Sequence, residues 1–235
     1  MNEPIALVSY LLLAITGISL CWMTATLTSV QGAGQAEPSR RQPSTPALGR
    51  RAAIVEAALR LFAENGYTAT TMEDIGRALN LRGPSLYKHV SSKQELLAEI
   101  MLRTMAALQR DHEIAIGSSK DVVEQLRRAV ETHVRYHARH RLEAFLGNRE
   151  LRSLDEYNHR RLLEQRKEYE RSFRALVERG IVENRFTARS VKLAVYGLLD
   201  MGVGVAVWFR EGGEFSVDEV AYQYGDLSML LLSAR

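Results

Sequence analysis

Residues 61–96 read LFAENGYTATTMEDIGRALNLRGPSLYKHVSSKQEL, and the turn residues of this stretch decide the fold. Gly66 suits the left-handed position at which a helix ends, and Asn80 tolerates the same conformation in a tight turn. Thr70 and Glu73 have the spacing of a capping box, which predicts a short helix between those two turns. The stretch therefore predicts short helices joined by tight turns.

The second half of the stretch predicts two more helices. Pro84 suits the first turn of a helix over about 83–90, because the amide hydrogen that proline lacks has no helical partner there. Ser92 and Glu95 repeat the capping-box spacing and predict a long helix over about 93–114.

Helical patterns extend in both directions from this stretch. Upstream, apolar residues between 54 and 62 recur at helical spacing, so a helix is expected over about 50–65. Downstream, helices are expected at 121–140, 142–153, 155–179, 188–210 and 217–233, with breaks at Gly117, Gly180 and Gly212. Only one of the five prolines, Pro84, lies beyond Pro46. The predicted fold class is all-α.

The composition excludes several classes of protein. The 235 residues include 31 Lys and Arg and 28 Asp and Glu, which gives a net charge of +3. A polycationic nucleic-acid coat is therefore excluded, and any DNA contact has to come from a local basic patch. The single cysteine, Cys21, excludes a disulfide framework and a multi-thiolate zinc site. Without a nucleophile elbow, phosphate loop or paired-carboxylate motif, we expect no enzyme and no cofactor.

The first 49 residues differ from the rest of the chain. Residues 5–30 are mostly apolar, and residues 31–49 are rich in Gly, Ser, Pro and Gln, as in a flexible arm. The apolar run has the length of an inner-membrane anchor, but it lacks the basic flank of a secretory signal. Three interpretations stay open: a start site further downstream, such as Met23, a membrane anchor, and a cleaved signal. The body of the chain is expected in the cytoplasm.

Residues 50–95 have the pattern of a helix-turn-helix DNA-binding domain, with a tight turn between the second and third helices. From Gly76 to Lys93 there are four cations, one histidine and no acid, which is the local patch that the net charge conceals. The residues LFAENGYTATTMEDI at 61–75, GPSLYKHV at 83–90 and Lys93 closely resemble the TetR family of one-component repressors. The departures from the family pattern are Asn80, Arg82 and Val90.

The resemblance implies a recognition helix that meets base edges in the major groove while neighbouring groups bind phosphates. It places Arg82, Ser85 and Lys88 at or near base edges. It places Thr71, Tyr87, His89 and Lys93 on phosphates. Packing beneath the motif is the alternative for Tyr87, whereas Lys93 disfavours its own helix N-terminus, so we expect an external anion beside it. Arg40, Arg41, Arg50 and Arg51 are either a minor-groove arm or solvated linker charges.

Residues 96–235 are expected to form a helical domain for ligand binding and dimerisation. The segments 188–210 and 217–233 are apolar on most sides, which predicts an interface resembling the family's dimeric four-helix bundle. Gly197, Gly202 and Gly204 fit close approach of helices there. The segment WFREGG at 208–213 is similar to a W-Y-R-P-G-G segment in a family branch that responds to acyl-CoA thioesters, although Trp208 can equally cap the interface. The candidate effector residues are His137, Phe145, Arg149, Tyr157 and Trp208.

Three histidines share one face of the predicted 121–140 helix. His133, His137 and His140 have the spacing of transition-metal ligands. No carboxylate completes that face, so no metal site is predicted.

Together these features predict a homodimeric, ligand-responsive transcriptional repressor that binds a pseudo-palindromic double-stranded DNA operator and is released by a small-molecule effector. An acyl-CoA thioester is one candidate effector. The alternatives are a membrane-tethered DNA-binding sensor of the same fold and a transcriptional activator. The predicted domains are the leader and arm at 1–49, the helix-turn-helix domain at 50–95, and the ligand-binding and dimerisation domain at 96–235. Effector binding between helices 142–179 and 188–210 is expected to shift the helix at 93–114.

Overall fold

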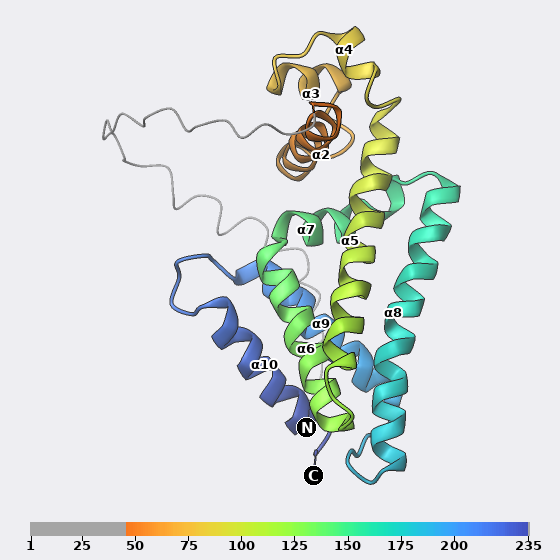
Figure 1. The fold of residues 1–235 in the computed structure, drawn as a ribbon, viewed down its shortest axis with the longest axis vertical. Coiled ribbons are helices and arrows are strands. Elements are labelled where there is room, and N and C mark those ends of the chain that lie inside the picture. The colour runs from red at the N-terminus through yellow and green to blue at the C-terminus, as the bar shows by residue number, and fades with distance from the viewer. Residues whose placement is uncertain (1–45, 235) are drawn as a thin grey trace, which may run out of the picture. The chain divides into compact units, whose positions relative to one another are not determined.

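A computed structural model of the chain describes residues 46–234, which lie within the compact unit Ser44–Arg235. Every regular element in that range is a helix (Figure 1). The helices are α2 (Pro46–Asn65), α3 (Met72–Ala78), α4 (Gly83–Tyr87), α5 (Lys93–Gly117), α6 (Val122–Arg139), α7 (Arg141–Arg149), the short 3-10 helix η1 (Leu151–Ser153), α8 (Glu156–Val182), α9 (Val191–Trp208) and α10 (Val217–Leu231). The all-α prediction is confirmed. The predicted membrane anchor at 5–30 lies outside the described residues.

Helices α2, α3 and α4 lie together at one end of this unit (Figure 1). Their core includes Phe62, Ile75 and Leu86, all of which are buried. The two predicted left-handed positions are confirmed, because Gly66 has a φ of 84° and Asn80 a φ of 53°. These turns separate the helices at the places where the sequence allows positive φ.

Helix α3 begins one residue later than predicted. Thr71 is its N-cap: the Thr71 hydroxyl oxygen accepts a hydrogen bond from the N–H of Asp74, and the Asp74 carboxylate accepts one from the N–H of Thr71. Thr70 is buried instead, and its Oγ1 lies 3.1 and 2.9 Å from the carbonyl oxygens of Leu61 and Gly66. The predicted capping box of Thr70 and Glu73 is therefore wrong, because the Thr70 hydroxyl serves the end of α2.

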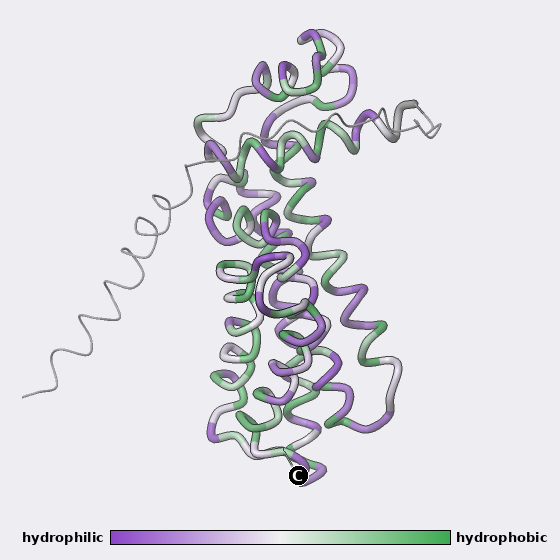
Figure 2. The backbone as a smooth tube through the Cα atoms, turned by 90° about the vertical axis from the view of Figure 1, so that its left-hand side faces the viewer, coloured by the Kyte–Doolittle hydropathy of each residue, from purple (hydrophilic) through white to green (hydrophobic). Residues whose placement is uncertain are grey.

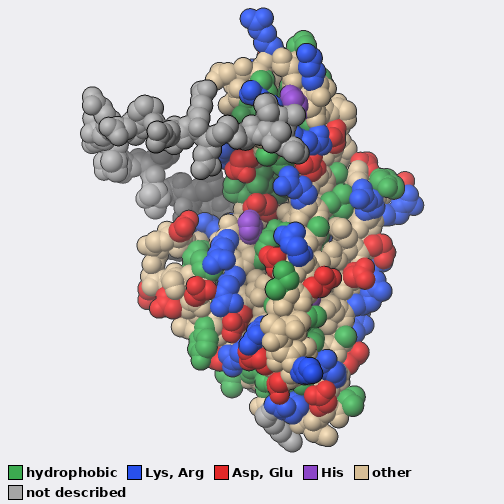
Figure 3. Space-filling view, viewed as in Figure 1, with side chains coloured by type: hydrophobic (Ala, Val, Ile, Leu, Met, Phe, Trp, Pro, Cys, Tyr) green, Lys and Arg blue, Asp and Glu red, His purple; other side chains and the backbone are tan. Residues whose placement is uncertain are grey.

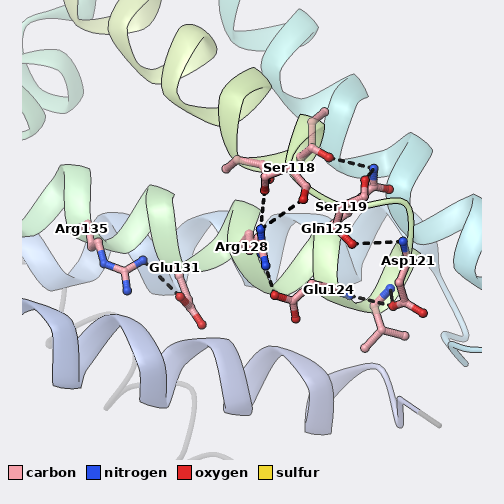
Figure 4. A network of polar contacts seen from close by, with 11 residues as sticks. Ser118, Ser119, Asp121, Glu124, Gln125, Arg128, Glu131 and Arg135 are labelled. Atoms are coloured by element: carbon pink, nitrogen blue, oxygen red, sulfur yellow. Dashed lines mark hydrogen bonds and ion pairs between the residues drawn. The ribbon is translucent and has the colours of Figure 1, made fainter.

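Helix α5 connects the two halves of the unit. It packs against α2 near its start and against α6 and α8 further along. Figure 4 shows how the turn after α5 is held: Asp121 accepts the N–H groups of Val123 and Glu124, and the Gln125 side chain donates to the carbonyl oxygen of Ser119. Arg128 adds an ion pair with Glu124. Asp121 is thus the N-cap of α6, as its side chain permits.

The remaining helices form a bundle around α6, which packs against α5, α8, α9 and α10. Figure 2 shows hydrophobic and hydrophilic residues alternating along these helices, as expected where one side of each helix is buried. The predicted break at Gly180 is wrong, since α8 continues to Val182. A Cβ at position 180 would collide with the ring of Phe186. Glycine is needed there for packing and not for ending the helix.

Helix α9 is, among the described residues, the helix long and apolar enough to cross a membrane, judged by length and composition alone. One side of it carries Val195, Leu198 and Val205, which are buried in the bundle. Leu193 and Val207 are exposed. The helix is therefore a core element on one side and an uncovered apolar surface on the other.

Candidate nucleic-acid interface

The turn between α3 and α4 is compact. Asn80 supplies its positive φ, and the N–H of Leu81 donates to the carbonyl oxygen of Gly76 at 2.8 Å. A Cβ on Gly76 would lie 3.1 Å from the carbonyl oxygen of Leu81. A side chain at position 76 would press on this turn, so glycine helps to set where α4 begins relative to α3.

Helix α4 presents a polar surface on a single buried anchor. Leu86 is 1 % exposed, whereas Tyr87 is 55 % exposed. The other exposed side chains of this segment are those of Arg82, Pro84, Ser85 and Lys88, and His89 is half-buried. Figure 3 shows Lys and Arg side chains gathered at this end of the unit. Tyr87 does not pack beneath the motif, so its hydroxyl is accessible to an outside partner.

Thr71 is exposed, but its polar groups are already engaged. Both its N–H and its hydroxyl donate to Asp74, at 2.9 and 2.6 Å. These bonds hold the pKa of the Asp74 carboxyl below its usual range. A phosphate contact from the Thr71 hydroxyl, which stays a prediction, would have to replace the bond to Asp74.

Lys93 has internal partners, contrary to the expectation of an external anion. Its Nζ donates to the carbonyl oxygens of Tyr67, Thr68 and Thr70 at 2.7, 3.3 and 2.8 Å. The ammonium also lies 4.3 Å from the centroid of the Tyr67 ring. All three ammonium hydrogens are used. Lys93 therefore ties the loop after α2 to the start of α5, which explains a cation at a helix N-terminus.

Arg51 is likewise not part of a free arm. Its guanidinium forms ion pairs with Glu95 and Glu99 on α5. Arg50 is exposed, and the other two arginines of the predicted arm lie outside the described residues. The minor-groove interpretation is wrong for Arg51 because its donors are turned inward.

Two histidines of the row on α6, His133 and His137, belong to the core. The Nδ1 atom of His133 lies 3.0 Å from the hydroxyl of Tyr169, and its Nε2 lies 3.1 Å from the carbonyl oxygen of Leu199. The His137 ring packs edge-on against that of His133, while the half-exposed His140 stacks on Tyr136. In residues 46–234 no group of three or more His, Cys, Asp or Glu is placed to hold a metal ion.

These buried imidazoles are neutral at neutral pH. Burial lowers the pKa of His133 to about 4 and that of His112 to about 4. Burial, with neighbouring cationic groups, lowers the pKa of His137 to about 2. Five buried polar atoms have no hydrogen-bond partner within the described residues, and three of them are Nδ1 of His112, Nδ1 of His137 and Oε1 of Gln165. They leave unused hydrogen-bonding capacity in the bundle interior.

Gly202 serves this core and not an interface between copies. A Cβ on Gly202 would lie 2.8 Å from Nε2 of His133 and closer still to Cδ2. Glycine therefore lets α9 approach α6 within one subunit. A Cβ on Gly197 or Gly204 would meet no atom closer than 3.9 Å, so those two positions stay open.

The five candidate effector residues occupy different surroundings. His137 is buried among the histidines, whereas Phe145 and Arg149 lie together on the surface of α7, with 5.5 Å from the guanidinium carbon to the ring centroid. Tyr157 is exposed beside Arg161 in a shallow groove of about 430 Å³. Trp208 lies near Tyr224, with ring centroids 6.5 Å apart. The structure brings Phe145 and Arg149 together and does not gather all five.

The WFREGG segment forms the turn after α9. Phe209 is 3 % exposed and anchors it, and the Arg210 guanidinium donates to the carbonyl oxygens of Val207 and Phe209. Gly212 has a φ of 73°. These residues therefore stabilise the turn independently of any ligand.

Many large apolar side chains of α9 and α10 are exposed. The exposed members are Leu193, Tyr196, Val207, Trp208, Tyr222, Leu227, Leu230 and Leu231. Soluble proteins rarely leave so much apolar side chain uncovered on two neighbouring helices. This surface is called the α9/α10 face below.

The contacts that join the DNA-binding half to the helical bundle have no signal in the sequence. Besides Arg51, the Gln94 side chain donates to the carbonyl oxygen of Ser153 in η1 at 2.7 Å. Glu150 accepts from the Ser153 hydroxyl at 2.6 Å and from the N–H of Tyr67 at 3.5 Å. No local pattern signals these contacts, because the partners lie 59 and 83 residues apart.

Comparison with known proteins identifies the same two parts of the chain. Residues 54–100 match the family described as bacterial regulatory proteins, tetR family, and residues 119–232 match the tetracyclin repressor-like C-terminal domain. The transcriptional repressor KstR2 of Rhodococcus jostii is 30% identical over 185 residues, which cover 78% of this chain and 90% of that protein.

Solved structures have the same fold. PfmR, a TetR family regulator of Thermus thermophilus, has a TM-score of 0.69 and 34% identity, covering 77% of this chain and 97% of its own. AibR in complex with isovaleryl coenzyme A and operator DNA has a TM-score of 0.69 and 21% identity, covering 79% of this chain and 100% of its own. With its helix-turn-helix half, its helical second half and these matches, the chain belongs to the TetR family of bacterial regulatory proteins.

Proposed function

We propose that this chain is a homodimeric transcriptional repressor that binds a pseudo-palindromic DNA operator through α4 and leaves it when a small molecule binds. The observation that carries the proposal is the exposed surface of α4, where Arg82, Ser85 and Lys88 surround the single buried anchor Leu86. Arg and Lys can donate to O6 and N7 of guanine, and the exposed hydroxyl of Tyr87 can donate to a phosphate. His89 and Thr71 are the further candidate phosphate contacts.

The two parts of the chain would have different functions. Residues 50–95 would bind DNA, and residues 96–235 would bind the effector and the second copy. Pairing of two α9/α10 faces would bury their exposed apolar side chains in a four-helix bundle. A two-fold dimer would present two α4 helices to successive major grooves, about 34 Å apart.

The effector would act on the bundle around α5. The unpartnered polar atoms of His112, His137 and Gln165 favour a ligand with hydrogen-bonding groups that reaches the interior. An acyl-CoA thioester is one candidate, supported by the WFREGG segment and by the isovaleryl coenzyme A bound to the fold neighbour AibR. Because His112 lies on α5, a shift of that helix would change the spacing of the two recognition helices. The protein is expected to act in the cytoplasm, where its operator is.

Binding of the full chain to duplexes selected from random DNA and to its own upstream region tests the DNA contacts. We expect Tyr87→Phe to weaken binding similarly across sequences, and Arg82→Ala to change the preferred sequence at a cost of about 1–3 kcal/mol. Tyr157→Phe and Arg171→Ala, at exposed positions of α8, are the matched controls. Unchanged affinity and preference in both α4 variants would refute the assignment of α4.

The effector and the direction of regulation need separate measurements. Native mass spectrometry should show a dimer, and isovaleryl-CoA should release the selected duplex whereas free coenzyme A should not. Release by neither compound would exclude this short-chain acyl-CoA. In a reporter strain, deletion of the gene raises expression for a repressor and lowers it for an activator.

A further inference from the structure

Arg51 on α2 connects three elements of the DNA-binding half. Its Nε lies 3.1 Å from Oε2 of Glu99, and one terminal nitrogen lies 2.6 Å from the same oxygen and 2.6 Å from Oε1 of Glu95. The other terminal nitrogen donates to the carbonyl oxygen of His89. Both glutamates lie on α5, and His89 lies two residues after the end of α4.

The bond to His89 holds the C-terminal end of the recognition helix. Carbonyl groups at the end of a helix have no partner within it and need one from elsewhere. The α3–α4 turn holds the other end, and Leu86 anchors the middle. The Arg51 guanidinium thus ties the C-terminal end of α4 to α5.

The connection between α4 and α5 is tied to the same cluster. Oε2 of Glu95 accepts from the N–H and the hydroxyl of Ser91 at 2.7 and 2.6 Å. These bonds and Arg51 lower the pKa of the Glu95 carboxyl to about 2, so that it stays ionised. The second carboxylate oxygen of Glu99 accepts from Arg103 at 3.3 Å. Four of the five N–H groups of a guanidinium are used by Arg51 within the protein.

Two carboxylates in a DNA-binding domain oppose binding through their charge, because DNA is a polyanion. Their benefit has to be geometric. We propose that Arg51 is a positioning residue for operator recognition: held by Glu95 and Glu99, it fixes the end of α4 against α5 without touching DNA. This inference rests on the proposed DNA-binding function.

The test measures binding of the full chain to a duplex that the wild-type protein has selected from random DNA. We expect Arg51→Gln to weaken binding by about tenfold, comparable with the loss of one charged hydrogen bond. Arg51→Lys should not restore it, since an ammonium cannot bridge both glutamates and the carbonyl oxygen. Glu99→Gln should also weaken binding, although removal of a negative charge near DNA would by itself strengthen it.

Matched controls come from the same helix. Arg60 and Glu56 form an exposed ion pair on α2 at 3.4 Å, so Arg60→Gln and Glu56→Gln remove the same charges without touching α4. Hydrogen exchange of residues 88–92 should be faster in Arg51→Gln and unchanged in Arg60→Gln. Circular dichroism at the assay temperature confirms that each variant is folded.

Salt dependence separates positioning from a direct phosphate contact. If Arg51 positions α4, the slope of log affinity against log salt concentration is the same in Arg51→Gln as in the wild type. A slope smaller by about one unit, or recovery in Arg51→Lys, means that Arg51 binds phosphate and overturns the inference. Stronger binding by Glu99→Gln overturns it too. A wild-type protein that selects no duplex refutes the proposed function itself.

Discussion

Substitution of Gly202 by alanine probes the packing of α9 against α6. The new Cβ would lie 2.8 Å from Nε2 of His133 and closer to Cδ2, so the imidazole has to move. That movement breaks its bonds to Tyr169 and Leu199, which are worth about 1 kcal/mol each. Overpacking adds about 1–3 kcal/mol, whereas alanine regains about 1 kcal/mol of helix propensity. We expect a net loss of about 2–4 kcal/mol in the free energy of unfolding.

The assay is urea unfolding at a fixed protein concentration, because dimerisation would make stability depend on concentration. For a chain of this size, each kcal/mol corresponds to roughly 2–4 °C in the midpoint of thermal unfolding. Gly147→Ala in α7 is the control. Its Cβ would come no closer than 3.5 Å to Arg166, so alanine there should be neutral or stabilising by up to about 1 kcal/mol.

A double-mutant cycle identifies the cause of the loss. In a His133→Ala background the collision is absent, and Gly202→Ala should no longer destabilise the protein. An equal loss in both backgrounds would refute the steric reasoning and return Gly202 to an interface between copies. So would a Gly202→Ala variant as stable as the wild type.

Two further predictions concern Lys93 and the buried histidines. Lys93→Met should lower the free energy of unfolding by about 1–3 kcal/mol, because three backbone carbonyl oxygens lose a charged donor. A midpoint of thermal unfolding equal to that of the wild type would contradict the bonding of Lys93 described above. Burial lowers the pKa of His112 and His133 from 6.5 to about 4, so unfolding takes up protons between those values and stability should fall as the pH drops from 6.5 to 4. His137→Met should make that fall shallower in urea unfolding at several pH values, since the His137 pKa is lowered as well, and an unchanged slope would argue against a neutral buried imidazole.

Helix ends could be predicted where one residue's own backbone preference decides them. Gly66 and Asn80 end up with positive φ, and Pro84 lies in the first turn of α4. Thr70 and Thr71 offer the same local chemistry, so their order could not be predicted. The fold decided it, because only Thr70 lies against the carbonyl oxygen of Leu61.

The exposed residues of the candidate site could also be predicted from the sequence. Helical spacing puts Leu86 inward, and a short helix with one inward residue leaves Arg82, Ser85 and Lys88 outward. The partners of the charged residues could not be predicted from the sequence. A cation in the sequence carries no sign of whether it faces solvent or a carbonyl oxygen.

By itself the sequence determined the all-α class, the helix-turn-helix pattern and the acid-free stretch from 76 to 93, since helical period, turn residues and charge are local properties. Only the tertiary structure decided that Lys93 and Arg51 have partners inside the protein and that His133 and His137 of α6 lie in the core. It also decided that Gly202 makes room for His133. Their partners are 23 to 69 residues away along the chain, and only packing of the helices brings those groups within hydrogen-bonding or contact distance.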